Sequence, residues 1–274
     1  MAVPQHSGQS GEGDFPWWLV TLVVIGVLLA SIIVSNGIYT QVFMTVAKGL
    51  WVTIMVTLVA FALATMLGLG VALLGLSDNK ALRQISRFYV EVIRGVPVLV
   101  LLFYIAFVGA PGIVYAWNFL ATPFIQAGVV EPMLVRDLSL MWRAIIALMI
   151  AYSAFIAEVF RAGIQSVDKG QIEAAKALGL SRFQRFRFVV FPQALKVIFP
   201  PLSNDFVAMV KDSSLVSVLG VADITQMGKV YASGSFRFFE TYSIVAYIYL
   251  VLTIGLSLLL RRVEKRMRDA QGQK

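Results

Sequence analysis

The chain has 274 residues, of which 59% are hydrophobic and 14% are charged, and its mean hydropathy is +0.82. These values lie far above those of a water-soluble domain and predict a protein that crosses a membrane several times. The sequence contains no cysteine and a single histidine, His6. Disulfides, thiolate catalysis and cysteine-based metal sites are therefore excluded, and little remains for histidine chemistry.

The net charge of +8 comes from Lys and Arg residues that gather at the ends of apolar segments. An excess of this kind is typical of the cytoplasmic loops of membrane proteins. It accounts for the charge without a single basic patch, so binding of nucleic acid is not expected.

The first two segments are a polar tail and an apolar stretch. Residues 1–16 contain no Lys or Arg, whereas a secretory signal needs a positively charged start, so we expect a disordered tail. Residues 17–36 are apolar and uncharged, and a bilayer core needs about 20 helical residues. They are predicted to form a first membrane-spanning helix.

Five further spans are expected, which makes six in all. Gly68, Gly70 and Gly75 in the second span are expected to permit close helix packing. Basic residues follow the second, fourth and sixth spans, and a basic tail at residues 263–274 closes the chain. By the positive-inside rule these segments are cytoplasmic, and counting back places the N-terminus inside. The five spans cover about residues 49–77, 95–109, 140–160, 201–220 and 241–260.

Two segments are expected on the external side. Residues 110–138 contain several Pro and Gly and predict a loop, with a short interfacial helix around Trp117. Residues 221–240 predict an amphipathic or irregular segment.

A charged, soluble-looking stretch lies between the fourth and fifth spans. Ala, Glu, Lys and Leu at residues 171–178 favour a helix, and Gly179 stands where a left-handed residue would end it. Ser181 and Gln184 fit the capping box of a second short helix. Pro192 is expected to end that second helix.

The second short helix combines charge with apolar surface. Exposed apolar surface of this kind marks an interaction site, so we favour a protein partner. Glu173 in the first short helix has a simpler alternative, an exposed carboxylate paired with Lys176. The second helix carries Arg182, Arg185 and Arg187 beside Phe183, Phe186 and Phe188.

The fifth span is unusual because it carries Asp205, Lys211 and Asp212. Such charges are expensive in a bilayer and should face a bundle interior or a watery path. They predict either a polar route for a solute, to which Ser213 and Ser214 add hydroxyls, or an internal Lys–Asp pair that holds helices together.

Charged residues also mark two other spans. Arg94 precedes the third span and is interpreted first as a cytoplasmic anchor, with the solute path as the alternative. Glu158 is expected either to line a path or to pair with Arg161 at a helix end. The phosphate-binding pattern G-x-x-x-x-G-K-[ST] is absent from the sequence. Uphill transport would therefore need an ion gradient or another subunit.

Several of these segments resemble one known family. Glu173-Ala174-Ala175 with Gly179 and Pro192 resembles the EAA coupling signature of permease subunits in ABC-type importers. The resemblance covers about residues 45–265, and the helix at residues 17–36 is an addition, since many members begin near Gly49. The polar amino acid branch of the family is similar to this chain at residues 94–97, 161–167, 169–171, 191–195, 200–204 and 211–217.

The resemblance implies an all-α membrane protein with the type I ABC importer permease fold. Residues 45–262 would form the transmembrane domain, and residues 165–192 its coupling segment. The partners implied are an ABC ATPase subunit, a second permease subunit that is identical or different, an external solute-binding protein, a polar amino acid and membrane lipid. ATP and Mg would bind to the ATPase in the bacterial inner membrane complex, and this chain would bind no cofactor and catalyse no reaction.

Candidate residues follow for two roles. By similarity the coupling role falls on Glu173, Ala174 and Gly179, and the same candidate set contains Ala175, Leu180, Arg182 and Arg185. By the charge argument, the candidate solute path consists of Arg94, Glu158, Lys211, Asp212, Ser213 and Ser214.

Two other functions are kept open. A secondary amino acid transporter driven by protons or sodium would use Lys211 and Asp212, and inverted repeats, which are not visible in the sequence, would favour it. A non-transporting scaffold or sensor would need an output domain, and none is recognised in the sequence.

Overall fold

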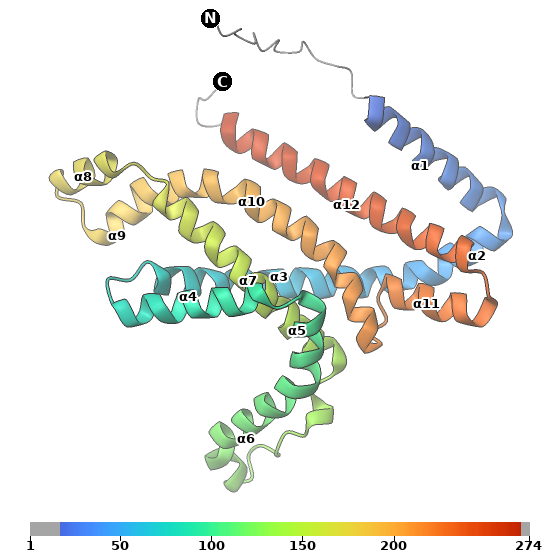
Figure 1. Cartoon of the computed structure of the whole chain (residues 1–274), viewed down its shortest axis with the longest axis horizontal. Coiled ribbons are helices and arrows are strands. Elements are labelled where there is room, and N and C mark those ends of the chain that lie inside the picture. The colour runs from blue at the N-terminus through green and yellow to red at the C-terminus, as the bar shows by residue number, and fades with distance from the viewer. Residues whose placement is uncertain (1–16, 270–274) are drawn as a thin grey trace, which may run out of the picture.

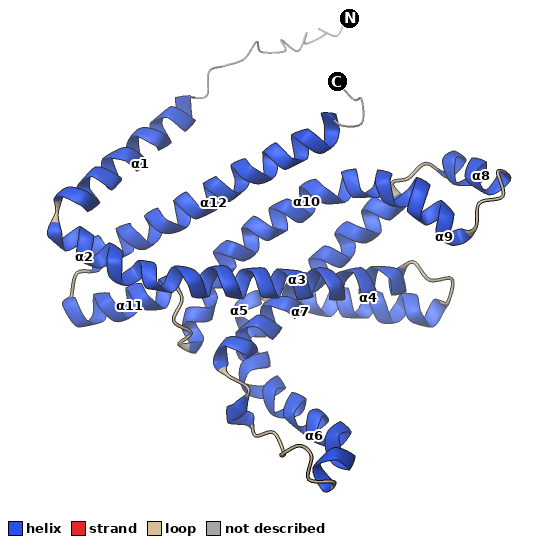
Figure 2. Cartoon of the chain, turned by 180° about the vertical axis from the view of Figure 1, so that it is seen from behind, coloured by secondary structure: helices blue, strands red, loops and turns tan. Residues whose placement is uncertain are grey.

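The computed structural model of the chain describes residues 17–269. The predicted tail at residues 1–16 lies outside the described residues, as do the last five residues of the basic tail. In the described part every regular element is a helix, in agreement with the expected all-α class (Figure 2).

Twelve α-helices are described between residues 17 and 269, several of them joined by short 3-10 or π-helical turns. They are α1 (Trp17–Ser35), α2 (Gly37–Val46), α3 (Leu50–Gly75), α4 (Lys80–Gly95), α5 (Val98–Tyr104), α6 (Ala110–Gln126), α7 (Leu140–Gln165), α8 (Lys169–Ala177), α9 (Arg182–Arg185), α10 (Phe191–Asp212), α11 (Ile224–Ser235) and α12 (Phe238–Asp269). The joining turns are η1 (Ala47–Gly49), η2 (Ile105–Gly109), η3 (Val135–Asp137), η4 (Phe186–Val190) and η5 (Ser213–Leu219).

The helices form an elongated bundle with three projecting parts. α8 and α9 stand out at one end, α1, α2 and α11 lie at the opposite end, and α5 with α6 points away from the body (Figure 1). The start of α1 and the end of α12 lie along the same edge in both ribbon views (Figures 1 and 2).

The core forms where α3 packs along α7. Gly68 permits this approach, because a Cβ there would lie 2.9 Å from the Ser153 carbonyl oxygen and from Ile156 Cγ2. The predicted packing role is therefore confirmed for Gly68, but it is wrong for Gly70, which has nothing within 4 Å of a Cβ. Small and branched side chains fill the contact, among them Val56, Ala60, Ala64, Ala144, Leu148 and Ala151.

Four helical stretches of the described residues are long and apolar enough to cross a membrane. α1 adds a shorter apolar stretch, Val20–Ser35, whereas α10 carries charged residues and does not qualify by composition. By length and composition, the structure thus supports four of the six predicted spans, namely the second, third, fourth and sixth. The four stretches are Gly37–Gly75, Val98–Gln126, Leu140–Gln165 and Phe238–Met267.

The external loop predicted at residues 110–138 contains the expected helix around Trp117, but this helix is much longer than expected and replaces the loop in the first half of the segment. The third span continues through the π-helical turn η2 into α6, which runs to Gln126. Pro111 does not break this helix because it lies in the first turn, where a missing N–H is tolerated. A short loop then folds back, and the Asn118 side-chain amide both donates to and accepts from the Met133 backbone.

Arg143, at the start of α7, fixes this external region. Its guanidinium donates to the carbonyl oxygens of Leu138 at 2.8 Å, Ala106 at 3.0 Å and Val135 at 2.6 Å. One planar, five-donor side chain therefore joins η2, η3 and α7.

The prolines between α9 and α10 also differ from expectation. Pro192 does not end the second short helix, because the π-helical turn η4 leads into α10 with Pro192 in its first turn. Pro200 and Pro201 lie inside α10, which begins at Phe191, so the start predicted for the fifth span at about residue 201 is wrong. α10 ends at Asp212, and η5 continues to Leu219.

Several other helix boundaries differ from the predicted ones for the same reason. The helices extend beyond the apolar residues on which the predictions were based. The second span begins at Gly37 rather than Gly49, and α12 carries helix through the basic residues after position 260. α4 occupies a stretch interpreted as a basic loop, and α11 is a regular helix within the predicted external segment.

Candidate functional site

The corner between α8 and α9 is closed by two local caps. Gly179 has φ +77°, its N–H donates to Lys176, and the Leu180 N–H reaches back to the Ala175 carbonyl oxygen at 3.2 Å. This pair of bonds is the Schellman arrangement that ends a helix at a left-handed residue. Ser181 and Gln184 then form the expected capping box of α9. The predicted pair of short helices is therefore confirmed, both in the glycine that ends α8 and in the capping box that begins α9.

The outer surface of the corner mixes charge with large apolar side chains. Leu178 is 82% exposed, Phe183 68% and Phe188 63%. Glu173, Ala174 and Arg182 are also exposed, while Leu180 and Arg185 are half-buried. Solvent does not favour so much apolar area on a protruding tip, so this surface fits a partner protein.

The inner surface of the corner is held against the bundle. The Gln193 side chain of α10 donates a 2.6 Å hydrogen bond to Gln171 of α8. Ile172 of α8 packs on an apolar cluster that includes Val190, and Ala175 is buried. Ala175 therefore serves packing at the base of α8, whereas Glu173 and Ala174 face outward.

Two charged side chains of the corner have no ion pair among the described residues. Glu173 forms no ion pair with Lys176, since the ion pair found among the described residues joins Glu158 and Arg161. The Arg185 Nε is buried and has no hydrogen-bond partner in the described part. The alternative of a self-satisfied Glu173–Lys176 pair is thus wrong, and the corner keeps unmatched charge.

The charged residues at the end of α10 are separated rather than paired. Lys211 is exposed, whereas Asp212 is half-buried and accepts a 2.8 Å hydrogen bond from the Tyr152 hydroxyl of α7. The internal Lys–Asp pair is therefore wrong. Ser213 is buried and its hydroxyl donates to the Val210 carbonyl oxygen, while Ser214 is half-buried. Asp205, about two turns before Asp212, has a buried Oδ2 without a partner in the described part.

A row of aromatic rings leads from Asp212 towards α4. The Tyr152 ring lies 6.2 Å from the Phe155 ring, and the Arg94 guanidinium lies over Phe155 at 5.4 Å. Phe155 lies ten residues before the end of α7, about 15 Å along the helix axis. Arg94 therefore lies beside α7 at the level of Phe155.

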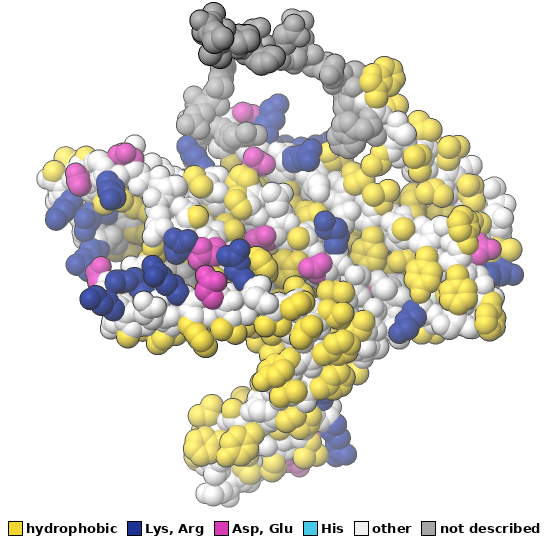
Figure 3. Space-filling model, viewed as in Figure 1, with side chains coloured by type: hydrophobic (Ala, Val, Ile, Leu, Met, Phe, Trp, Pro, Cys, Tyr) yellow, Lys and Arg dark blue, Asp and Glu magenta, His cyan; other side chains and the backbone are white. Residues whose placement is uncertain are grey.

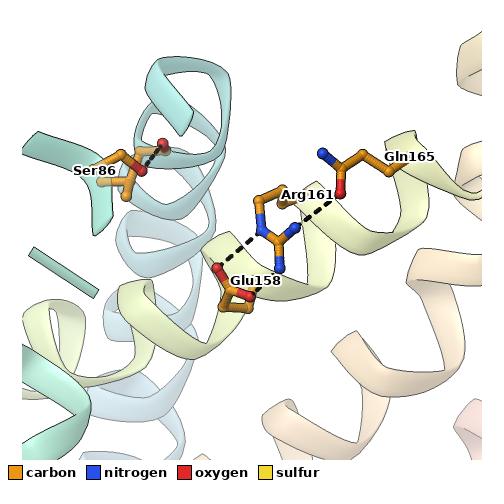
Figure 4. A network of polar contacts seen from close by, with 5 residues as sticks. Ser86, Glu158, Arg161 and Gln165 are labelled. Atoms are coloured by element: carbon orange, nitrogen blue, oxygen red, sulfur yellow. Dashed lines mark hydrogen bonds and ion pairs between the residues drawn. The ribbon is translucent and has the colours of Figure 1, made fainter. Parts of the chain in front are cut away.

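Glu158 and Arg161 form the ion pair that was one of two alternatives for Glu158. The Arg161 Nε and Nη2 reach the two carboxylate oxygens at 3.1 and 2.5 Å, and Nη1 reaches the Gln165 side chain at 2.8 Å (Figure 4). Across from them on α4, the Ser86 hydroxyl donates to the Val71 carbonyl oxygen of α3 at 2.8 Å.

These side chains line a cleft of about 420 Å³ between α4 and the ends of α3 and α7. Glu158 therefore both pairs with Arg161 and faces open space, and Arg94 shares that space. The cleft is lined by Gly75, Arg83, Ser86, Arg87, Glu91, Arg94, Glu158, Arg161 and Gln165.

Sequence reasoning missed Tyr152 and Phe155, which connect the two charged positions. Both lie in a long apolar run, where an aromatic residue is ordinarily core. The only local signal is that a Tyr hydroxyl buried in a bilayer needs a partner.

The comparisons agree with this architecture. Residues 64–269 match the family described as binding-protein-dependent transport system inner membrane component. The probable amino-acid permease protein YxeN of Bacillus subtilis is 36% identical over 225 residues, which are 82% of this chain and 92% of that protein. The glutamine transport system permease protein GlnP of Escherichia coli is 37% identical over 187 residues, 68% of this chain and 75% of that protein.

A solved structure is similar in both fold and sequence. It is described as an amino acid ABC transporter with histidines, and the matched chain has a TM-score of 0.67 and 38% identity. The alignment covers 85% of this chain and 97% of that one.

The fold and the exposed, capped corner define the permease of a type I ABC importer, a multi-pass helical membrane protein. The chain belongs to the family of binding-protein-dependent transport system inner membrane components. Members of this family work with a separate ATPase and a solute-binding protein.

Proposed function

We propose that this chain is the permease subunit of an ATP-driven importer of a polar amino acid in a bacterial inner membrane. The single observation that carries the proposal is the α8–α9 corner, exposed at its tip, locked by two caps and fixed to the bundle at its base. Similarity to proteins named as amino-acid and glutamine permeases supports the solute class.

The energy source is a partner ATPase, which holds ATP and Mg. The printed sequence has no phosphate-binding loop of its own. The outer surface of the corner supplies what a docking element needs, namely apolar side chains for burial at Leu178 and Phe183 and charge for orientation at Glu173 and Arg182. Similarity to ABC permeases favours this source over an ion gradient.

Coupling passes through rigid contacts from the corner to the bundle. The hydrogen bond between Gln171 and Gln193 joins α8 to α10, and Ile172 packs against the buried apolar cluster that includes Val190 and Ala194. A displacement of the corner therefore moves α10, whose far end carries Asp212. This connects ATPase closure to the centre of the bundle.

The solute path runs beside Asp212, Tyr152, Phe155 and Arg94. Asp212 offers a carboxylate to a solute ammonium group, and Arg94 offers a guanidinium to a carboxylate. A route with a negative side chain at one position and a positive side chain at another suits a zwitterion. In a medium of low dielectric constant, both charged groups of a zwitterion need a partner of opposite charge. Glu158 and Ser214 extend the polar surface of this route.

Two permease subunits, identical or different, enclose the path, and an external solute-binding protein delivers the amino acid. The experiment reconstitutes this chain with a second permease subunit, the ATPase and the binding protein in proteoliposomes. Uptake of radiolabelled glutamine and related amino acids should require ATP and the binding protein. Uptake by the permease alone under a proton or sodium gradient would contradict the proposal.

A further inference from the structure

α4 has three different faces along its length. One face is buried against α3 and α7 through Ser86 and Val90. A second face exposes large apolar side chains at Ile85, Phe88 and Val92, of which Phe88 is 72% exposed. A third face is charged and opens on the cleft, with Arg83, Arg87, Glu91 and Arg94 spaced three or four residues apart.

The charge in the cleft is not balanced within the described residues. Four arginines and two glutamates line it, and Arg161 is matched by Glu158. Glu91 forms no ion pair in the described part, although Arg87 and Arg94 lie on the same face. The Arg83 guanidinium is fixed by the Ser77 and Asp78 carbonyl oxygens, both at 3.0 Å, which satisfy hydrogen bonds but do not neutralise charge.

The cleft reaches the ends of α3 and α7, which the positive-inside rule predicts to be cytoplasmic. Gly75 and Gln165 are the last residues of α3 and α7, and α8 follows directly. In the surface view, basic side chains gather over α4 with acidic ones between them (Figure 3). A basic pocket between membrane helices on the cytoplasmic side is the feature that binds anionic lipid headgroups.

We propose that the cleft between α4 and α7 binds the phosphate headgroup of an anionic phospholipid of the cytoplasmic leaflet. Arg87 and Arg83 face the headgroup at the mouth. The acyl chains lie along the apolar face formed by Ile85, Phe88 and Val92, which directly borders the charged face. This pairing of charge with apolar surface fits an amphiphile better than a free solute. The inference depends on the proposed orientation in the bilayer, but on neither the solute nor the ATPase.

The test measures lipid binding by the full-length chain, purified with its partner subunits in a neutral detergent. Native mass spectrometry with equal amounts of phosphatidylglycerol and phosphatidylcholine should show preferential retention of phosphatidylglycerol. Arg87→Gln should reduce that affinity by roughly five-fold. Lys80→Gln is the matched control, because it removes one exposed cation from the same helix outside the cleft.

Three outcomes would overturn the proposal. The first is an equal loss of phosphatidylglycerol in both variants, which would mean attraction to general surface charge. The second is inorganic phosphate displacing the lipid at equal concentration, which would make the mouth of the cleft a site for a soluble anion. The third is unchanged lipid retention in Arg87→Gln while Phe88→Ser alters only subunit stoichiometry, which would assign the apolar face to a second permease. If Arg87→Gln misfolds, Arg87→Lys should keep the preference and serve in its place.

Discussion

The Tyr152 hydroxyl donates a 2.8 Å hydrogen bond to the Asp212 carboxylate and so joins the middle of α7 to the end of α10. The Tyr152 side chain is 4% exposed, whereas the neighbouring Lys211 points to the outside of the chain. The Tyr152 hydroxyl thus fixes the position of the Asp212 carboxylate without forming an ion pair with it. This arrangement suits a carboxylate that binds a cation in transit.

Tyr152→Phe removes that donor while keeping the ring. A hydrogen bond to a charged group contributes about 1.5–3 kcal/mol, so the position of Asp212 should become less defined. Uptake at low solute concentration should fall by about ten-fold in reconstituted vesicles. Tyr115→Phe is the control, because Tyr115 is 74% exposed. Equal uptake in Tyr152→Phe and wild type would remove this bond from the proposed path.

Gly49→Ala should destabilise the packing of α3 against α11. A Cβ at Gly49 would lie 2.4 Å from the Asp223 carbonyl carbon and oxygen, and neither backbone can move freely. Overpacking of this kind costs about 1–3 kcal/mol or more, so the apparent unfolding temperature in detergent should fall.

Gly70→Ala, in α3, should have the opposite effect. Nothing lies within 4 Å of a Cβ at Gly70, so alanine should leave stability unchanged or raise it by up to about 1 kcal/mol. Equal unfolding temperatures for the two variants would contradict the close contact at Gly49.

Arg143→Lys should loosen the external region around η2. Lysine keeps the charge but replaces a fork that serves three carbonyl oxygens with a single point donor. Leu138 and Ala106 are buried, and leaving a buried carbonyl without a donor costs about 1–3 kcal/mol. Hydrogen exchange should therefore become faster at residues 105–109 and 135–138, while the α8–α9 corner stays unchanged. Arg136→Lys, at an exposed position, should have no such effect.

The sequence predicted those features whose causes are local. The capping roles of Gly179 and Ser181 were predicted correctly because a helix cap depends on residues within one turn. The apolar runs of α3, α7 and α12 are long enough to be recognised as membrane spans from composition alone. Pro111 and Pro192 misled because a π-helical turn before each of them places it in the first turn of a new helix. Such a turn leaves no simple trace in composition.

The candidate site was less predictable because its contacts join distant parts of the chain. Tyr152 and Asp212 are 60 residues apart, and Arg94 meets Phe155 across two helices. Charge alone left open whether Lys211 and Asp212 line a solute path or form an internal Lys–Asp pair, and neighbouring residues on a helix point in different directions. Only the packing of α7 against α10 determines which of the two charges faces inward.

The central claim is that the α8–α9 corner transmits ATPase closure to the bundle. Gly179 tests it well, since nothing lies within 4 Å of a Cβ there and any effect must come from its φ of +77°. Valine strains this conformation by roughly 1–2 kcal/mol, whereas asparagine tolerates it. The two substitutions therefore separate the geometry of the corner from the mere loss of glycine.

The decisive measurement is the number of ATP molecules hydrolysed per amino acid imported, in proteoliposomes that contain all subunits. Gly179→Val should raise this ratio several-fold by lowering uptake more than hydrolysis, and Gly179→Asn should keep it close to the wild-type value. A wild-type ratio in Gly179→Val, with normal uptake, would contradict the account.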